Sequence, residues 1–428
     1  MKFSFYTLGC KVNQYETQAM RELLLSNGFK AAKDGENPDV FIVNSCTVTA
    51  ESDRKTRQAV RRFRKKFPGA IIVLTGCMPQ AFPDEARSLF EADVIIGNTS
   101  QQNLVETINE FVRNKKRIVE IFSHEKDEKI CPLNVSNFDE RTRAFLKIED
   151  GCERYCTYCT IPAARGYVRS KPIETIKNEV KALAEKGFKE IVLVGINLSA
   201  YGKDTPYNLC DAVDAVCENE TIKRVRLGSL EPDHISDEML NRFKNQEKFC
   251  PQFHLSLQSG CDETLKRMNR HYDGAFYTDL VNRIRNIFPD CAITTDVMVG
   301  FPGETKDEFD KSLAFVKKIA FSKAHVFAYS RRKGTFADKM QNQVTNFEKS
   351  SRSNLMIEAT LKTERDFLEK QISKVFPVLF ETFDGEFYVG HTPNYTCVKV
   401  NEKVVCGEIK NVKFLNLLDE ETIFGTVV

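Results

Sequence analysis

The chain has 428 residues, of which 42% are hydrophobic and 29% charged, as is typical of a soluble globular protein and not of a disordered one. This length is enough for about two to four domains. The formal net charge is only +2, so any binding to nucleic acid would have to depend on local patches. No apolar run approaches the roughly 20 residues of a membrane-spanning helix, and residues 1–6 do not resemble a signal peptide. Because fourteen cysteines accompany no secretion signal, we expect reduced, metal-binding thiols in a cytoplasmic protein.

The first part of the chain alternates between predicted strands and helices. Strands are expected at residues 2–7, 39–43, 70–74 and 93–96, and helices at 15–26, 51–66 and 101–112. Repeated alternation predicts a parallel sheet that is covered by helices on both faces. We expect this α/β domain to span residues 1–120 and to be followed by a polar linker over residues 121–141.

Three cysteines of this domain occupy the same kind of position. Cys10, Cys46 and Cys77 each follow closely after the end of a predicted strand. Because the carboxyl ends of parallel strands meet at one edge of a sheet, these thiols are expected to converge there. The alternative is that they are small buried hydrophobic residues, as most free cysteines are. Their occurrence after three successive strands favours convergence.

The helix expected at residues 51–66 is strongly basic. It carries eight Lys or Arg side chains and two acids near its start, and Arg54, Lys55, Arg61 and Arg62 are among the cations. Such a surface suits contact with phosphate groups. The alternative is a solvated helix face whose acids favour the helix N-terminus. Because the helix follows Cys46 directly, we favour a contact with RNA.

A second alternation of strands and helices extends over residues 142–370. Six strands are expected, at residues 144–148, 190–194, 225–230, 253–257, 293–299 and 324–329, and helices include 173–185, 306–319 and 346–370. Six such units are too few for a closed eight-stranded barrel. They predict an open, partial barrel whose site lies at the carboxyl ends of the strands.

The first of these strands leads into three cysteines, Cys152, Cys156 and Cys159, with the spacing C-x3-C-x2-C. Thiolates at this density favour an iron–sulfur cluster. Three ligands would leave one iron of a four-iron cluster open to a small molecule. A zinc site is the alternative, but structural zinc sites normally have four ligands, and no nearby Cys or His completes such a pattern.

Polar or glycine-containing segments follow the other strands of this domain. Residues that we expect to face the same cavity are Gly195, Asn197, Glu231, Ser256, Gln258, Gly300 and Tyr329. Inside a barrel, polar side chains require a polar ligand or a network that satisfies its own hydrogen bonds. After the last strand, Arg331 and Arg332 stand close to aromatic residues. This combination suits stacking on a base and contact with its phosphate.

The last segment, residues 371–428, changes character. Five short strands are expected, at residues 375–380, 386–391, 397–400, 408–415 and 423–427, and they predict a small antiparallel barrel. The segment has five lysines against eight acids, so RNA binding here would depend on shape or stacking and not on charge.

Taken together, these motifs resemble the radical S-adenosylmethionine methylthiotransferase family. The segments that carry the resemblance are residues 7–16 (TLGCKVNQYE), 44–48 (NSCTV), 75–77 (TGC) and 151–159 (GCERYCTYC). Tyr158 stands at the aromatic position before the last cysteine, and residues 371–428 resemble the TRAM domain of this family. The resemblance extends over nearly the whole chain in the expected order.

The resemblance implies two 4Fe-4S clusters, one on Cys152, Cys156 and Cys159 and a second, sulfur-carrying one on Cys10, Cys46 and Cys77. It also implies that S-adenosylmethionine is bound by Tyr158, Gly195, Asn197, Glu231, Ser256, Gln258, Gly300 and Tyr329. The implied partners are an electron donor and the anticodon stem-loop of tRNA, which Arg54, Lys55, Arg61, Arg62, Arg331 and Arg332 are expected to contact.

The first motif, residues 9–16, resembles the branch of the family that inserts a methylthio group at C2 of N6-threonylcarbamoyladenosine next to the anticodon, using two molecules of S-adenosylmethionine. The alternatives within the family are isopentenyladenosine in tRNA and a ribosomal-protein side chain. An alternative from another class is a non-catalytic, metal-stabilised RNA-binding protein. It predicts bound zinc and no cleavage of S-adenosylmethionine.

Overall fold

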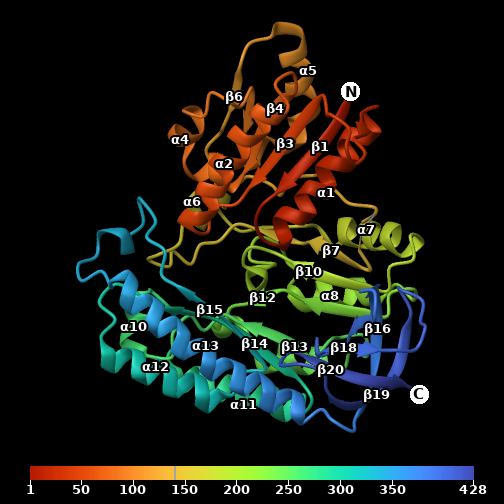
Figure 1. Cartoon of the computed structure of the whole chain (residues 1–428), viewed down its shortest axis with the longest axis vertical. Coiled ribbons are helices and arrows are strands. Elements are labelled where there is room, and N and C mark those ends of the chain that lie inside the picture. Colours follow the sequence, from red (N-terminus) through yellow and green to blue (C-terminus); the bar gives the residue numbers. More distant parts are fainter. Residues whose placement is uncertain (139–140) are drawn as a thin grey trace.

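The computed structural model describes residues 1–138 and 141–428 and divides into three structural units (Figure 1). An α/β unit packs on one side of a partial barrel of parallel strands, and a small closed β-barrel packs beside the same strands. None of the described helices combines the length and apolarity needed to cross a bilayer.

The N-terminal unit is a six-stranded sheet in which every strand is parallel to its neighbours, with the order β2-β1-β3-β4-β5-β6. Separate apolar clusters cover its two faces, as expected for a parallel sheet. Its strands are β1 (Lys2–Thr7), β2 (Lys30–Ala31), β3 (Val40–Ser45), β4 (Ile71–Gly76), β5 (Val94–Ile96) and β6 (Ile118–Glu120). Its helices are α1 (Lys11–Ser26), α2 (Ala50–Lys66), α3 (Cys77–Ala81), α4 (Pro83–Arg87), η1 (Asn98–Asn103) and α5 (Leu104–Asn114).

The central unit is a curved sheet of parallel strands in two hydrogen-bonded parts, β11-β10-β7 and β12-β13-β14-β15. Because β11 and β12 are consecutive in the chain, the two parts form one open, six-unit barrel with β7 and β15 at its edges. Its strands are β7 (Arg143–Lys147), β10 (Glu190–Val194), β11 (Arg224–Leu227), β12 (Ser229–Leu230), β13 (Gln252–Leu255), β14 (Ala292–Val299) and β15 (Lys323–Ala328). The short strands β8 (Glu149–Asp150) and β9 (Arg169–Ser170) pair outside it.

Helices cover the outside of this barrel, and its core is the largest apolar cluster of the described chain (Figure 1). The helices α12 and α13 begin at threonine caps, Thr305 and Thr345, each closed by a glutamate three residues later. The helices are α6 (Ile161–Arg165), α7 (Ile173–Glu185), η2 (Leu198–Ala200), α8 (Leu209–Cys217), η3 (Pro232–His234), α9 (Asp237–Lys244), α10 (Asp262–Arg267), α11 (Gly274–Ile287), α12 (Lys306–Ile319), η4 (Ala337–Lys339) and α13 (Asn346–Glu369).

The C-terminal unit is a closed barrel in the order β16-β17-β18-β20-β19. Neighbouring strands are antiparallel except for β18 and β20, whose parallel pairing closes the barrel. Backbone carbonyls of this unit accept hydrogen bonds from Arg224 and Arg226 of β11, which attaches it to the partial barrel. The strands are β16 (Val375–Phe383), β17 (Tyr388–His391), β18 (Cys397–Val400), β19 (Ile409–Leu417) and β20 (Thr422–Val427).

The α/β class, the partial barrel and the small terminal barrel are confirmed by this architecture. The sequence did not predict the short elements β2, β6, α3, α4, α6 and α10, whose apolar patterns are too brief to show a period. The expected linker, residues 121–141, lies partly outside the described residues. No helix or strand occurs over residues 121–138.

Candidate active site

The first group of three cysteines lies at the carboxyl edge of the N-terminal sheet. Cys10 caps α1 after β1, Cys46 follows β3, and Cys77 begins α3 after β4. These strands are neighbours in the sheet, and the three thiols interact electrostatically with one another. Gly76 makes the turn into α3 with φ of +96°, and a side chain there would stand 2.4 Å from the carbonyl oxygen of Ser45.

Polar side chains hold this N-terminal cysteine group in place. The Cys10 thiol donates to Oδ1 of Asn13 at 3.4 Å, and Nδ2 of Asn13 donates to the carbonyl of Ser45 at 2.9 Å. Burial and the neighbouring thiols raise the pKa of Cys77 to about 12, although Nε of Arg165 lies 3.2 Å from its sulfur. Burial thus opposes a free thiolate at Cys77, and a bound cationic group would favour one.

The second group, Cys152, Cys156 and Cys159, occupies the loop between β8 and α6. Its three thiols also interact with one another, and burial, followed by these neighbours, raises the pKa of Cys159 to about 12. Backbone N–H of Ile161 donates to the sulfur of Cys159 at 3.4 Å, and a guanidinium N–H of Arg270 donates to that of Cys156 at 3.2 Å. Such donors stabilise the charge on a ligated thiolate.

Among residues 1–138 and 141–428, no three His, Cys, Asp or Glu side chains are placed to hold one metal ion. In a four-iron cluster each thiolate binds a different iron, whereas the ligands of zinc share one ion.

The two cysteine groups are neighbours although 75 residues or more separate them in the chain. The hydroxyl of Thr160, next to Cys159, donates to the carbonyl of Thr47, next to Cys46, at 3.2 Å. Arg165, which belongs to the helix after the second group, reaches the sulfur of Cys77. These two contacts hold the two cysteine groups close to one another.

Three of the expected cofactor-binding side chains carry buried polar atoms that lack a partner. Oδ1 of Asn197, Oε1 of Gln258 and the hydroxyl of Tyr329 are buried without a hydrogen bond to any described residue. Because buried polar atoms are normally paired, these atoms point to a polar ligand. Tyr158 and Tyr329 pack beside Phe301 and form an apolar surface next to the second cysteine loop.

The other expected cofactor contacts are already engaged within the protein. Glu231 pairs with Arg270 and lies 3.8 Å from Arg154, and the carbonyl of Ser256 accepts from Arg270 at 3.2 Å. A side chain at Gly195 would stand 2.6 Å from Oε2 of Glu149, and one at Gly300 would stand 2.4 Å from Cγ of Lys349. Both glycines thus make room for a neighbouring side chain.

Three arginines of the site were not predicted from the sequence. Arg154, Arg165 and Arg270 are all buried beside the cysteine groups. Arg154 lies inside the C-x3-C-x2-C segment, which is the only signal that points to it. Arg165 and Arg270 are isolated cations in sequence, and only the fold brings them to the sulfurs.

The basic helix α2 is exposed, but several of its cations have partners. Arg54 and Lys55 both contact Glu51, and Arg61 lies 3.2 Å from Glu91. Arg62 stacks over the ring of Phe63 and over a neighbouring tyrosine. Exposed pairs of this kind are weak, so these side chains remain available to phosphate groups.

One expected RNA contact is corrected by the structure. The side chain of Arg332 is only 4% exposed, donates to Thr47 and forms an ion pair with Asp53 at 2.6 Å. It therefore ties the end of the partial barrel to the start of α2 and does not present its charge to solvent. Arg331 is 62% exposed, and its partner is Asp338.

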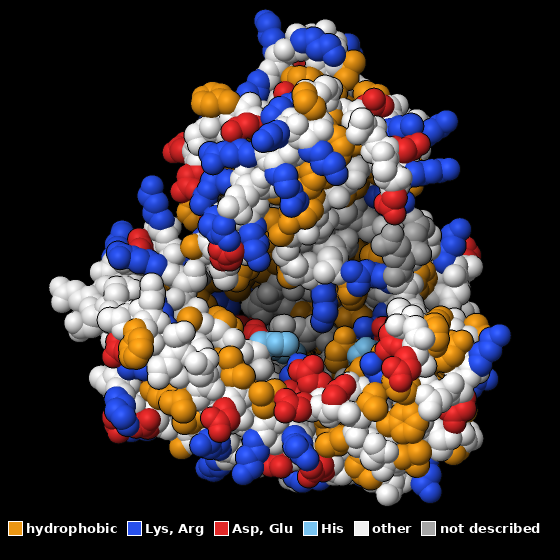
Figure 2. Space-filling view, viewed as in Figure 1, with side chains coloured by type: hydrophobic (Ala, Val, Ile, Leu, Met, Phe, Trp, Pro, Cys, Tyr) orange, Lys and Arg blue, Asp and Glu red, His pale blue; other side chains and the backbone are white. Residues whose placement is uncertain are grey.

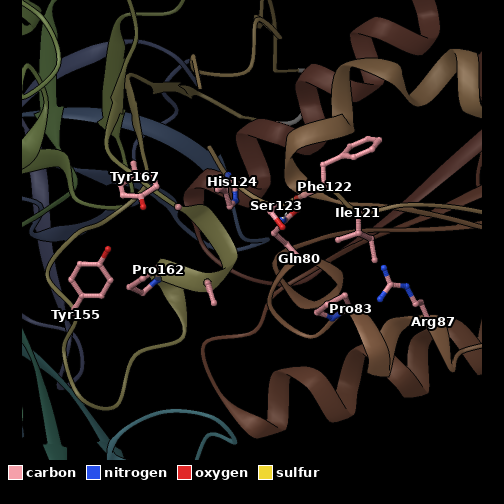
Figure 3. Close-up of a pocket in the computed structure, with 12 residues that line it drawn as sticks. Gln80, Pro83, Arg87, Ile121, Phe122, Ser123, His124, Tyr155, Pro162 and Tyr167 are labelled. Carbon is pink, nitrogen blue, oxygen red and sulfur yellow. Dashed lines mark hydrogen bonds between the residues drawn. The ribbon is translucent and has the colours of Figure 1, made fainter. Parts of the chain in front are cut away.

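A cavity of about 510 Å³ lies between the second cysteine loop and the N-terminal unit and was not expected from the sequence. Figure 3 shows Tyr155, Pro162 and Tyr167 on one side of it and Pro83 and Arg87 on the other. Gln80, Ile121, Phe122 and His124 also line this cavity.

Comparison with known proteins agrees with this geometry. Residues 146–316 match the Radical SAM superfamily, and residues 2–97 match the Uncharacterized protein family UPF0004. A relative from Bacillus subtilis, named threonylcarbamoyladenosine tRNA methylthiotransferase MtaB, is 36% identical over 96% of this chain and 93% of its own length. A relative from Clostridium botulinum, named tRNA-2-methylthio-N(6)-dimethylallyladenosine synthase, is 33% identical over 97% of this chain and 94% of its own.

Among solved structures, the radical S-adenosylmethionine methyltransferase TsrM from Kitasatospora setae superposes with a TM-score of 0.58 at 13% identity, over 77% of this chain and 75% of TsrM. At that identity the likeness concerns the fold alone. The Bacillus subtilis relative establishes more, because its 36% identity extends over nearly the whole length of both chains. The chain belongs to the radical S-adenosylmethionine methylthiotransferase family.

Proposed function

We propose that this protein inserts a methylthio group at C2 of N6-threonylcarbamoyladenosine, next to the anticodon of tRNA, with two 4Fe-4S clusters and S-adenosylmethionine. The observation that carries the proposal is the adjacency of the two cysteine groups, linked through Thr160 and Thr47. One group alone would serve radical formation. A second one opening toward the same space provides a place for the sulfur that is transferred.

The chemistry requires a radical. The hydrogen at C2 of an adenine has no useful acidity, so general base catalysis cannot remove it. When bound, the cluster on Cys152, Cys156 and Cys159 supplies the electron for cleavage of S-adenosylmethionine, which makes a radical able to take that hydrogen. The thiols of Cys10, Cys46 and Cys77 would hold the second cluster with the sulfur, and a further molecule of S-adenosylmethionine would supply the methyl group.

The side chains around the cysteines have separate tasks in this proposal. Oδ1 of Asn197 and Oε1 of Gln258 accept hydrogen bonds from the bound cofactor. Tyr158 would pack against the adenine of S-adenosylmethionine. Tyr158 forms an apolar surface there with Phe301 and Tyr329. Arg270 donates to Cys156 and holds Glu231 in place.

The choice of substrate rests on the relatives and on charge. The relative named for threonylcarbamoyladenosine is more similar to this chain than the one named for dimethylallyladenosine. The exposed cations of α2, among them Arg54, Lys55, Arg61 and Arg62, lie directly after Cys46 and would contact the anticodon stem-loop. An anticodon-loop base is already unpaired, so presenting it to the site costs little. An external electron donor completes the reaction, which takes place in the cytoplasm.

Single cysteine variants separate the two proposed clusters. After anaerobic reconstitution, the wild type should contain about eight iron atoms per chain, as two four-iron clusters require. Cys156→Ala should abolish formation of 5′-deoxyadenosine, whereas Cys77→Ala should retain it and lose sulfur insertion. Cys217→Ala is the matched control, since this buried cysteine belongs to neither group. Zinc in place of iron, or sulfur insertion by Cys77→Ala, would refute the two-cluster assignment.

The substrate is tested in cells. Nucleoside mass spectrometry of tRNA from a deletion strain should show loss of the methylthio form of N6-threonylcarbamoyladenosine and its return on complementation. Loss of the dimethylallyl-type nucleoside in its place would show that the other tRNA substrate is the correct one.

A further inference from the structure

Lys11 has an exposed side chain near both edges of the partial barrel. It is the first residue of α1 and follows Cys10 directly. Its ammonium group interacts electrostatically with Arg143 on β7 and also with His325 on β15. β7 and β15 are the two edges of the open barrel, so Lys11 lies near the opening between them. Figure 2 shows this face as a hollow bordered by Lys, Arg and His side chains and, along its lower rim, by a group of Asp and Glu side chains.

Lys11 differs from the other cations of the hollow because it lacks a counterion. Arg143 pairs with Glu381 at 3.1 Å, and Arg226 pairs with Glu190 at 2.8 Å. For Lys11, no carboxylate of residues 1–138 or 141–428 lies within 4.0 Å of its Nζ. An ammonium group without a carboxylate partner creates a local positive potential that favours an anion.

The acid that faces this space does not fill that role. Asp296 on β14 lies 3.4 Å from Nε2 of His254, and His325 stands on the next strand. The charge of Asp296 is thus directed toward the histidines. Asp296 therefore does not pair with Lys11, whose charge stays available to an anion.

We propose that Lys11 binds the carboxylate of the threonylcarbamoyl group, and this inference rests on the proposed function. The threonylcarbamoyl substituent ends in a carboxylate, whereas a dimethylallyl substituent is a hydrocarbon without charge. Lys11 stands beside Cys10, so a substrate whose C2 approaches the sulfur-carrying site would bring its N6 substituent into the same hollow. A cation at this point selects the charged substituent because its ammonium group would otherwise remain unpaired.

The test compares two ligands that differ only in this charge. One is an anticodon stem-loop carrying N6-threonylcarbamoyladenosine, and the other is the same RNA with the carboxylate converted to a primary amide. Binding to the reconstituted protein is measured by fluorescence anisotropy at fixed salt. The ratio of the two affinities removes the contribution of the phosphates, which is common to both RNAs.

The wild type should prefer the carboxylate by ~10- to 100-fold, the range of one charge-assisted hydrogen bond. Lys11→Met should bind both RNAs equally, and Lys11→Arg should keep the preference. Lys30→Met, at an exposed lysine of β2, is the matched control and should behave as the wild type. Iron content and visible absorption of each variant show whether the clusters are present.

The outcomes separate this inference from the proposed function. If the wild type methylthiolates the threonylcarbamoyl RNA but Lys11→Met keeps the full preference for the carboxylate, the assignment of Lys11 is wrong and the function stands. If the wild type bound the carboxylate RNA and the amide RNA with equal affinity, the assignment of Lys11 would also be wrong, whatever the variants did. If the wild type acts only on a dimethylallyl RNA, both the function and the inference fail.

Discussion

Arg165 provides the sharpest test of how the two α/β units are held together. Its side chain is fully buried and donates to both carboxylate oxygens of Glu16, to Asp150 at 3.4 Å and to the sulfur of Cys77 at 3.2 Å. Lys147 bridges the same two acids at 2.7 and 2.5 Å. Glu16 belongs to α1 and Asp150 to β8, so the network joins the cysteine domain to the partial barrel.

Arg165→Met removes one partner of this buried network while keeping a long side chain. Glu16 then loses the guanidinium that engages both of its oxygens, and only Lys147 still compensates the charge. Breaking a buried pair in this way costs about 3–5 kcal/mol of the free energy of unfolding. The matched control is Arg87→Met, which breaks the exposed contact of Arg87 with Asp84 at 3.0 Å and should cost at most about 1 kcal/mol.

Urea unfolding followed by circular dichroism, with the cluster-free proteins under anaerobic conditions, measures both costs. Limited proteolysis should also cleave Arg165→Met faster than the wild type between the two units. If Arg165→Met and Arg87→Met lower the unfolding midpoint equally, the buried network does not stabilise the contact between the units. The reasoning from burial would then be refuted.

Three further predictions follow from charges whose environment is known. Burial alone would raise the pKa of Glu16 and of Asp150, but the surrounding Lys and Arg side chains lower both. Their contribution to stability is therefore present above the unfolded pKa values near ~4 and is lost as pH falls through the lower folded values, which urea unfolding from pH 7 to pH 3 would detect. Arg332→Met should lower the unfolding midpoint because it leaves a buried acid unpaired, whereas Arg331→Met should not, and equal midpoints would contradict this contrast. Arg61→Gln should weaken tRNA binding and reduce the salt slope of log Kd by about one, and an unchanged slope would remove this residue from the RNA surface.

The cysteine spacing and the alternation of strands and helices were readable from the sequence because they depend on residues that are close together in the chain. The C-x3-C-x2-C segment occupies one loop, and a strand followed by a helix shows its own hydrophobic period. Parallel pairing then follows from chain connectivity, since strands joined through helices align their carboxyl ends at one edge. The positions of Cys10, Cys46 and Cys77 at that edge are therefore a consequence of a local pattern and a general rule.

Only the tertiary structure decided how the separate units meet. Arg165 reaches a sulfur 88 residues earlier in the chain, and Arg332 is buried against an acid 279 residues away, so neither contact leaves a periodic signal. The same limit explains why Arg332 was expected on the RNA surface, since a cation next to an aromatic residue looks alike whether it is exposed or paired. Lys11 shows the reverse case. It belongs to a motif that is readable in the sequence, but only the fold brings it near β7 and β15, two barrel edges that are distant from it in sequence. Local spacing thus determined which residues are candidates for the chemistry, and long-range packing decided which charged side chains have partners and which do not.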